Sequence, residues 1–111
     1  PIFARPVHLT REMEIECCSF SACIPGVVDA ISTIFTPDAL PNVRTVEIRD
    51  DDAITATRQL IAAGFPVGPS SGLNYLAALN FAREHRDAAV VTVFCDRMER
   101  YFTTELFTPY R

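Results

Sequence analysis

The 111-residue sequence has the length of one domain or of part of one, and a chain of this size buries about two-thirds of its unfolded surface. Hydrophobic residues make up 49% of it, the formal net charge is −4 and the mean hydropathy is +0.15. The negative charge argues against nucleic acid and anionic membranes as partners. No apolar run approaches the roughly 20 residues of a membrane span, and charged residues interrupt the N-terminal region, so neither a membrane helix nor a signal peptide is expected.

The ten positively charged residues are all arginine, and the chain contains no lysine. Chemistry that needs a primary side-chain amine, above all Schiff-base formation, is therefore closed to this chain. The cysteines have neither a secreted disulfide spacing nor two paired zinc-ligand motifs, even with His8 upstream, so we expect a reduced, cytoplasmic protein without a structural metal. These cysteines are Cys17, Cys18, Cys23 and Cys95.

The N-terminal third gives weak structural signals. Pro1 and Pro6 predict an irregular segment over 1–10, because proline fixes φ and has no amide hydrogen. A free N-terminal proline is also a catalytic base in the tautomerase superfamily, but only Pro1 and the chain length are similar to that family. The apolar stretch 27–35 is suited to a short helix or a packed segment, and prolines bracket a loop over 36–42.

The segment 43–48 predicts a strand, and its polar residues favour a place near the edge of the sheet. Aspartates 50–52 predict an N-cap and a negatively charged first turn, which the helix dipole favours; a cation site is the weaker alternative. The helix is expected to reach Ala63 and to stop at Gly64. Its apolar face consists of Ile54, Thr57, Leu60 and Ile61.

The chain is organised around the turn at 67–72. Gly68-Pro69 is a turn dipeptide, and Ser70 or Ser71 is expected to cap the helix that follows. Almost every residue of 73–82 is apolar, which predicts a helix covered on two sides.

The run 88–95 is continuously apolar and rich in valine, which is typical of a parallel strand buried on both faces. A polar loop at 96–101 and a helix at 102–107 are expected after it. A buried helix that leads into a buried strand predicts an α/β fold with a layered parallel sheet and flanking helices.

Five segments occur in a specific order along the chain. They are Ile24-Pro25-Gly26, Asp51-Asp52-Ala53-Ile54, Val67-Gly68-Pro69-Ser70-Ser71-Gly72, Val91-Thr92-Val93-Phe94-Cys95-Asp96 and Glu99-Arg100-Tyr101-Phe102-Thr103-Thr104. Together they resemble the C-terminal third of the cysteine synthase (O-acetylserine sulfhydrylase) and cystathionine β-synthase family. The resemblance covers 24–107 and leaves 1–23 poorly matched, so that 1–111 is expected to be a single domain or a fragment.

The resemblance implies part of the large domain of a fold-type II enzyme that uses pyridoxal phosphate. The activity implied for the complete enzyme is β-replacement on an activated serine. The family's Schiff-base lysine, its cofactor-contacting asparagine and its phosphate loop lie upstream of the matched region. We therefore expect no catalytic residue in this chain, no covalently bound cofactor and no activity of the chain alone.

Two departures from the family pattern concern the cofactor and substrate sites. Asp96 and Arg97 lie on the side where the pyridine nitrogen would bind, and Arg97 replaces a serine of many members. A guanidinium would disfavour protonation of that nitrogen; alternatively Arg97 points away, and Asp96 or a backbone group takes the role. The segment 16–23 has no glycine where the family has a glycine-rich loop.

The apolar helix and the apolar run both require cover, and few other segments are available to supply it. We expect the chain to form a homo-oligomer or to bind the upstream segment of the enzyme, unless 27–35 folds back over this surface. The alternative to an enzyme portion is a non-catalytic binding or oligomerisation module that retains the fold. No nucleic acid or membrane partner is expected.

Overall fold

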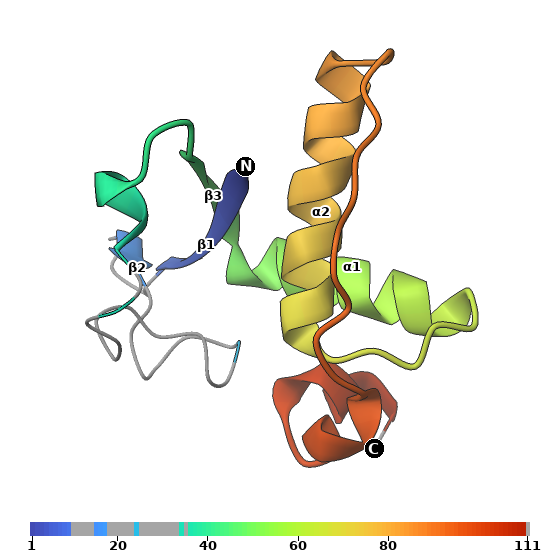
Figure 1. Ribbon diagram of the computed structural model, residues 1–111. Coiled ribbons are helices and arrows are strands. Elements are labelled where there is room, and N and C mark those ends of the chain that lie inside the picture. Colours follow the sequence, from blue (N-terminus) through green and yellow to red (C-terminus); the bar gives the residue numbers. More distant parts are fainter. Residues whose placement is uncertain (10–14, 18–23, 25–33, 35, 111) are drawn as a thin grey trace.

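A computed structural model describes residues 1–9, 15–17, 24, 34 and 36–110 (Figure 1). The described residues form one sheet in the order β2-β1-β3, in which β1 runs parallel to β3 and antiparallel to β2. The strands are β1 (Ile2–Leu9), β2 (Ile15–Cys17) and β3 (Arg44–Arg49), and the helices are α1 (Asp50–Ala62) and α2 (Pro69–Glu84). Short 3-10 helices occupy Pro37–Ala39, Met98–Tyr101 and Glu105–Tyr110. The α/β class is confirmed, although the sheet is small and mixed.

The prediction of an irregular segment over 1–10 was wrong, because β1 is the central strand. The carbonyl of Pro1 accepts the Arg44 amide at 2.9 Å, so the odd-numbered backbone groups of β1 face β3. Pro6 therefore faces the opposite edge, where pairing with β2 starts only at Val7. Its missing amide hydrogen costs no bond to β3, which is why a proline is tolerated here.

The strand and helix predicted over 43–63 are confirmed to within a residue. β3 is an edge strand, and α1 follows it directly. All three aspartates lie in the first turn, but the N-cap is the backbone of Arg49 and not an aspartate. The helix ends as expected: Gly64 has φ +95°, and the Phe65 amide donates to the Leu60 carbonyl at 2.9 Å.

Helix α2 begins at Pro69, and its N-cap is Gly68 without a side-chain capping bond, so the predicted serine cap was wrong. The helix crosses α1 at Gly72. A Cβ atom there would lie 2.5 Å from the Ala53 carbonyl oxygen and closer still to Thr57 Oγ1, so only glycine permits this approach. No residue of α2 beyond Ala77 is buried, and the predicted cover on two sides is therefore wrong.

The run 88–95 is extended but belongs to no sheet of the described residues, and it is exposed. Val91 is 91% exposed and Val93 is 64% exposed, so the prediction of a strand buried on both faces was wrong. The run passes along α2 (Figure 1), where Asn74 Nδ2 donates to the Val93 carbonyl at 3.1 Å. Its extended conformation fits the β-branched sequence, but the strands of the described residues do not pair with it.

Two apolar clusters hold the described structure together. The first joins the sheet to both helices and contains Ile24, Ile48, Ala53, Leu73 and Ala77. The second joins α1 to the C-terminal 3-10 helices and contains Ile54, Tyr101 and Leu106. The predicted helix over 102–107 is thus replaced by two 3-10 helices separated by a turn. The prediction for 27–35 lies almost entirely outside the described residues.

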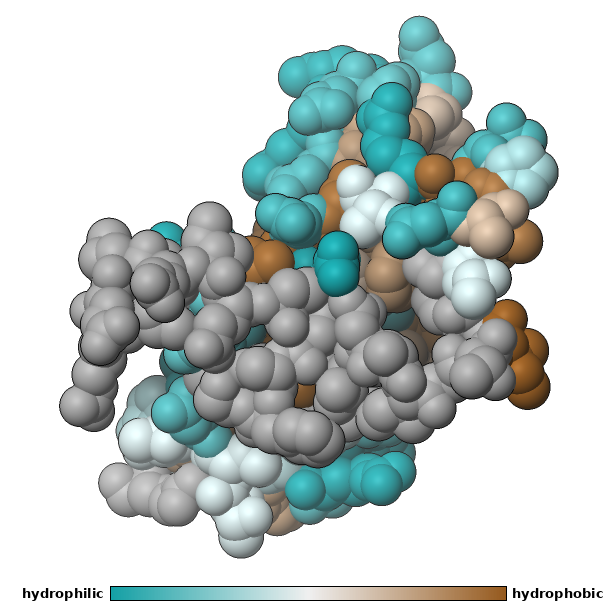
Figure 2. All heavy atoms as spheres, turned by 90° about the vertical axis from the view of Figure 1, so that its left-hand side faces the viewer, coloured by the Kyte–Doolittle hydropathy of each residue, from teal (hydrophilic) through white to brown (hydrophobic). Residues whose placement is uncertain are grey.

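The described helices include none that is long and apolar enough to cross a membrane. On the face drawn in Figure 2, hydrophilic side chains predominate in the upper part, with smaller apolar areas between them.

Candidate functional site

The candidate site lies where the turn before α2 meets the segment after the run 88–95. Two backbone hydrogen bonds join them: the Gly68 amide donates to the Asp96 carbonyl at 3.0 Å, and the Met98 amide donates to the Pro66 carbonyl at 3.1 Å. Together they form an antiparallel bridge between Val67 and Arg97. Two of the five sequence motifs, 67–72 and 91–96, therefore lie in direct contact although the whole of 73–90 separates them in the sequence.

Ser71 contributes a further link between these motifs. Its hydroxyl oxygen accepts the Cys95 amide at 3.1 Å, and the side chain is fully buried. The serine predicted to cap α2 instead positions the end of the apolar run. A hydroxyl at this position has a structural role that a helix-capping rule does not predict.

Asp96 is held by Gly68 and Tyr101. Its Oδ2 accepts a short hydrogen bond from the Tyr101 hydroxyl, and its Oδ1 is buried without a hydrogen-bond partner. A Cβ atom at residue 68 would collide with Oδ1 and would lie 2.5 Å from Tyr101 Cε2. The glycine is thus required by the carboxylate and the phenol packed against it.

Tyr101 was not among the predicted site residues. Its side chain is buried, and burial together with the hydrogen bond and negative charge of Asp96 raises the pKa of Tyr101 to about 12. The phenol is therefore a hydrogen-bond donor at neutral pH, and it fixes the orientation of the Asp96 carboxylate. The spacing of an aspartate five residues before a tyrosine was the available signal, although such a pair is not specific.

Arg97 forms an ion pair with Glu99. Its Nη2 lies 2.7 Å from Glu99 Oε1, and its Nε also donates to the same carboxylate. The hydrogen bond between the two side chains raises the pKa of Arg97 and lowers the pKa of Glu99. Both side chains are exposed, so the pair is screened by solvent. Whether Arg97 or Asp96 takes the place beside the pyridine nitrogen in a complete enzyme stays a prediction.

The N-terminus of α2 faces the Asp96 carboxylate, which packs against Gly68. A negative charge is favoured at this end of a helix by the orientation of its peptide dipoles. Because Asp96 already places a carboxylate there, a phosphate group would meet charge repulsion at this turn.

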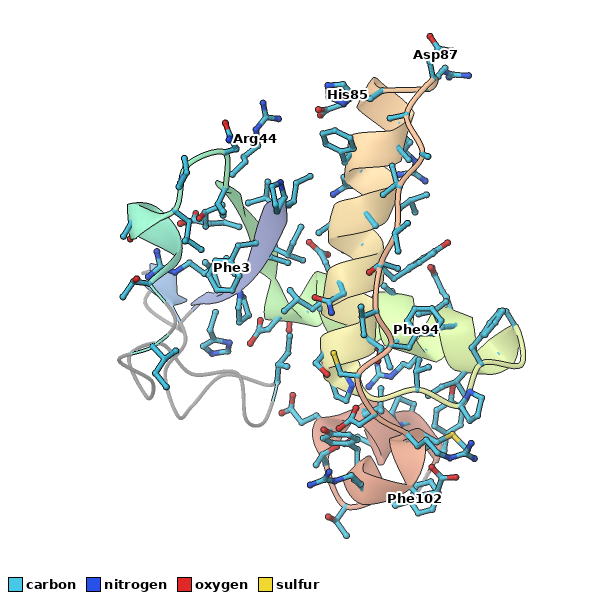
Figure 3. All side chains as sticks on the ribbon, viewed as in Figure 1. Phe3, Arg44, His85, Asp87, Phe94 and Phe102 are labelled. Carbon is cyan, nitrogen blue, oxygen red and sulfur yellow. The ribbon has the colours of Figure 1, made fainter. Side chains whose placement is uncertain are left out.

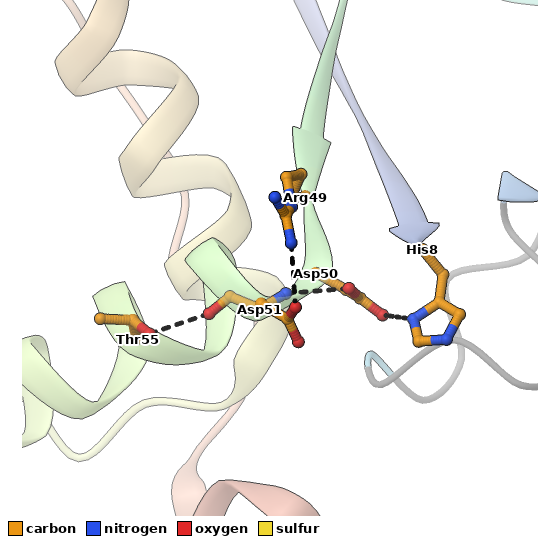
Figure 4. Close-up of polar contacts among 5 residues, drawn as sticks. All are labelled: His8, Arg49, Asp50, Asp51 and Thr55. Carbon is orange, nitrogen blue, oxygen red and sulfur yellow. Dashed lines mark hydrogen bonds and ion pairs between the residues drawn. The ribbon is translucent and has the colours of Figure 1, made fainter. Parts of the chain in front are cut away.

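A second polar group lies at the carboxyl ends of the parallel strands. His8 Nδ1 is 2.7 Å from Asp50 Oδ2, and Asp50 is 1% exposed (Figure 4). The Asp51 amide donates to Asp50 Oδ1 at 2.9 Å, and the Asp51 carboxylate pairs with Arg49 at 3.3 Å. Asp50 thus satisfies one of the free donors at the start of α1. The aspartate cluster was predicted, but its histidine partner was not.

No set of three or more potential metal ligands comes together among the residues whose placement is described. Cys95 is an exposed free thiol. Cys18, Cys23 and the side chain of Cys17 lie outside the described residues, as does most of the segment 16–23 in which the family has its glycine-rich loop.

No protein-family model matches the chain. Cysteine synthase B of Campylobacter jejuni is 36% identical over 77 residues, which are 69% of this chain and 25% of that protein. A probable cysteine synthase of Bacillus subtilis is 43% identical over 65 residues, or 57% and 21% of the two chains. Cysteine synthase B of Escherichia coli is 34% identical over 89 residues, or 76% and 29%.

The chain therefore spans between a fifth and a third of the length of these curated relatives. All three are named as cysteine synthases, the family that the order of the five motifs indicates. The resemblance predicted from the sequence is confirmed: the chain is related to the cysteine synthases and corresponds to a C-terminal portion of a protein of that family.

Proposed function

We propose that this chain supplies the C-terminal part of the large domain of a fold-type II, cysteine synthase-like enzyme. The reaction of the complete enzyme would be β-replacement on an activated serine. The observation that carries this proposal is the packing of Asp96 and Tyr101 against Gly68, because it brings three of the matched motifs into one structural unit.

Pyridoxal phosphate would supply the electron sink of such a reaction. The described residues of this chain do not form a site for it by themselves. No lysine is present to bind the cofactor covalently, and the Arg97 guanidinium is engaged by Glu99. Asp96 retains one oxygen without a hydrogen-bond partner, but this oxygen is buried against the start of α2. Covalent attachment of the cofactor would therefore need a lysine from outside this chain, with Asp96 and Arg97 on its pyridine-nitrogen side only in a complete enzyme.

A single-polypeptide chimera tests the proposal. The present chain replaces the matched C-terminal portion of Escherichia coli cysteine synthase B, and the chimera is expressed in a strain that requires cysteine. We expect a soluble protein that binds pyridoxal phosphate and restores growth without cysteine. A soluble chimera that forms no cysteine from an activated serine contradicts the proposal.

Two variants of the chimera sharpen this test. Gly68→Ala displaces the Asp96 carboxylate and is expected to abolish growth. Gly64→Ala is the matched control: its Cβ position has open space, and the strain from φ +95° should lower stability only modestly and leave growth intact. If the first chimera is insoluble, the same exchange in the Bacillus subtilis relative provides a second host with 43% identity over 65 residues.

The second candidate function is a non-catalytic binding or oligomerisation module. The exposed valines of the run 88–95 favour it, because apolar surface of this kind marks a contact with another polypeptide. This candidate predicts a stable assembly of the chain with itself and no rescue by the chimera. Sedimentation of the isolated chain at micromolar concentration distinguishes the two.

A further inference from the structure

A groove of about 200 Å3 lies between the sheet and the C-terminal half of α2. Its walls are formed by β3 and α2, Ile2 of β1 also lines it, and all of its lining residues belong to the described part of the chain. Figure 3 labels Arg44 at the start of β3 and His85 at the end of α2, both toward the top of the view. Pockets for drug-sized ligands have roughly 300–1,000 Å3, so this groove is suited to a smaller molecule.

The wall formed by β3 combines apolar surface with one positive charge. Successive side chains of a strand alternate between its faces, so Arg44, Val46 and Ile48 share one face. This face is directed toward α2, because Ile48 and Ala77 belong to one apolar cluster against which Val46 packs. Glu47 also lines the groove, but the same alternation places its side chain on the other face. The charge that β3 presents to the groove is therefore the Arg44 guanidinium.

The wall formed by α2 combines apolar surface with one negative charge. Its lining residues recur at the three- and four-residue spacing of a single helix face; they are Ala77, Asn80, Phe81 and Glu84. The Phe81 ring is stacked on His85, with 4.1 Å between the ring centroids. Glu84 is the last residue of α2, where the helix dipole also favours a positively charged group. This wall therefore provides a fixed aromatic ring, an amide and a site for a cation.

The two charges of opposite sign are available to a ligand. Within the described part of the chain, neither Arg44 nor Glu84 belongs to an ion pair. A guanidinium matches the geometry of a carboxylate, and a carboxylate beside a helix C-terminus is suited to an ammonium group. The Asn80 amide can donate to the first ligand group and accept from the second. The groove is thus complementary to a molecule with both charges and an apolar part.

We propose that this groove binds a free amino acid with a small apolar side chain. The α-carboxylate of the amino acid bonds to Arg44, its α-ammonium group bonds to Glu84, and its side chain packs on Phe81. Residues 80 and 84 lie 12 and 16 positions after Gly68, which is roughly 18–24 Å along the helix at about 1.5 Å per residue. The groove is therefore separate from the candidate site around Asp96, and the inference does not rest on the proposed function.

The charges of the groove favour such a ligand over other classes of small molecule. A nucleotide or a free phosphate would be repelled by Glu84, and a nucleotide also requires a larger pocket. Three potential metal ligands do not come together among the described residues, so a bare metal ion has no ligand set here. A purely apolar molecule would gain nothing from Arg44 and Glu84.

The test is an NMR titration of the ¹⁵N-labelled full chain with L-leucine. We expect saturable shifts of the amides of 44–48 and 77–85, and no shift at the Gly64 turn. Two comparison ligands keep the apolar part of leucine and lose one charge each: 3-methylbutylamine lacks the carboxylate, and 4-methylpentanoate lacks the ammonium group. Each should bind about fivefold more weakly than leucine, since an exposed ion pair contributes up to about 1 kcal/mol.

Variants assign each charge to its partner. Arg44→Gln should weaken leucine binding about fivefold and make leucine and 3-methylbutylamine bind equally well. Glu84→Gln should do the same for leucine and 4-methylpentanoate. Arg86→Gln is the matched control, because Arg86 is exposed just beyond α2 and does not line the groove. All three side chains are exposed, so the circular dichroism of each variant should match that of the parent.

Three results would overturn the amino-acid site. The first is the absence of saturable shifts at the groove up to the solubility of leucine. The second is equal affinity of the parent chain for leucine and the two comparison ligands, which would leave only an apolar pocket. The third is an Arg44→Gln or Glu84→Gln variant that binds leucine as tightly as Arg86→Gln does. The growth test of the chimera concerns the proposed function alone, so the two proposals succeed or fail separately.

Discussion

Two segments of the C-terminal half differ sharply in burial: the last 3-10 helix, Glu105–Tyr110, and the run 88–95. Leu106, in the last 3-10 helix, is 1% exposed because it packs on Ile54 of α1, and Arg58 of α1 donates to the carbonyls of Glu105 and Leu106 at 2.6 and 2.9 Å. The run 88–95 is more apolar in sequence, yet its valines face open space. Composition therefore does not decide which segment is buried. A segment is buried when another element offers both an apolar face and partners for its backbone.

Truncating one side chain in each segment should give the largest difference in the free energy of unfolding. Leu106→Ala should lower the free energy of unfolding by about 2–5 kcal/mol, since it opens a cavity beside α1. Val91→Ala should change it by less than about 0.5 kcal/mol, because the side chain contributes little to the packed structure. Urea unfolding followed by circular dichroism measures both. Equal effects of the two substitutions would mean that the run 88–95 is packed in the isolated chain.

The crossing of α1 and α2 at Gly72 gives a second test of the packed region. Gly72→Ala should destabilise the chain by about 1–3 kcal/mol, because the new methyl group meets the backbone of α1 at Ala53 and the side chain of Thr57. Gly64→Ala is the matched control, with open space but φ +95°, and it should cost about 1 kcal/mol. If Gly64→Ala were the more harmful of the two, the close approach at Gly72 would not be limiting.

The smallest expected effect on stability concerns the hydrogen bond between Tyr101 and Asp96, which links the C-terminal 3-10 helices to the end of the run 88–95. Tyr101→Phe removes the bond to Asp96 and should cost about 1–2 kcal/mol at pH 7. In the folded chain the pKa of Tyr101 is raised to about 12, above its usual value near 10. The stability that depends on the neutral phenol is thus complete below about pH 10 and is lost as the pH rises through 12.

Unfolding midpoints measured between pH 9 and 12 test this dependence. The parent chain should lose stability over this range by more than Tyr101→Phe does. Glu99→Gln removes an exposed ion pair with Arg97 and serves as the control, with no change in the unfolding midpoint expected. A Tyr101→Phe variant with the same pH dependence as the parent would show that another group titrates.

The sequence predicted those elements whose signals are local. The end of α1 at Gly64 follows from the need for a positive φ, and the strand before α1 follows from β-branched residues and the aspartates after it. The strand β1 was missed because a proline is tolerated in a strand only where its nitrogen is not needed for a backbone hydrogen bond. Which edge Pro6 faces is set by the pairing of β1 with β3, a strand far along the chain.

The candidate site was predicted in part. The sequence identified Asp96 and Arg97 through a resemblance, but it could not show that Glu99 holds Arg97 or that Tyr101 holds Asp96. The burial predicted for 88–95 failed for a different physical reason. Its pattern is suited to a strand with neighbours on both edges, and the described residues do not provide them.

The unpaired valine run also has a consequence for the handling of the protein. Segments with high β-propensity, no charge and no proline are those that stack into cross-β fibrils when they are exposed. Here the run is bracketed by Arg86-Asp87 on one side and Asp96-Arg97 on the other, and charged gatekeepers of this kind oppose stacking. The charged residues on either side of the run 88–95 thus help to prevent the runs of different molecules from stacking on one another.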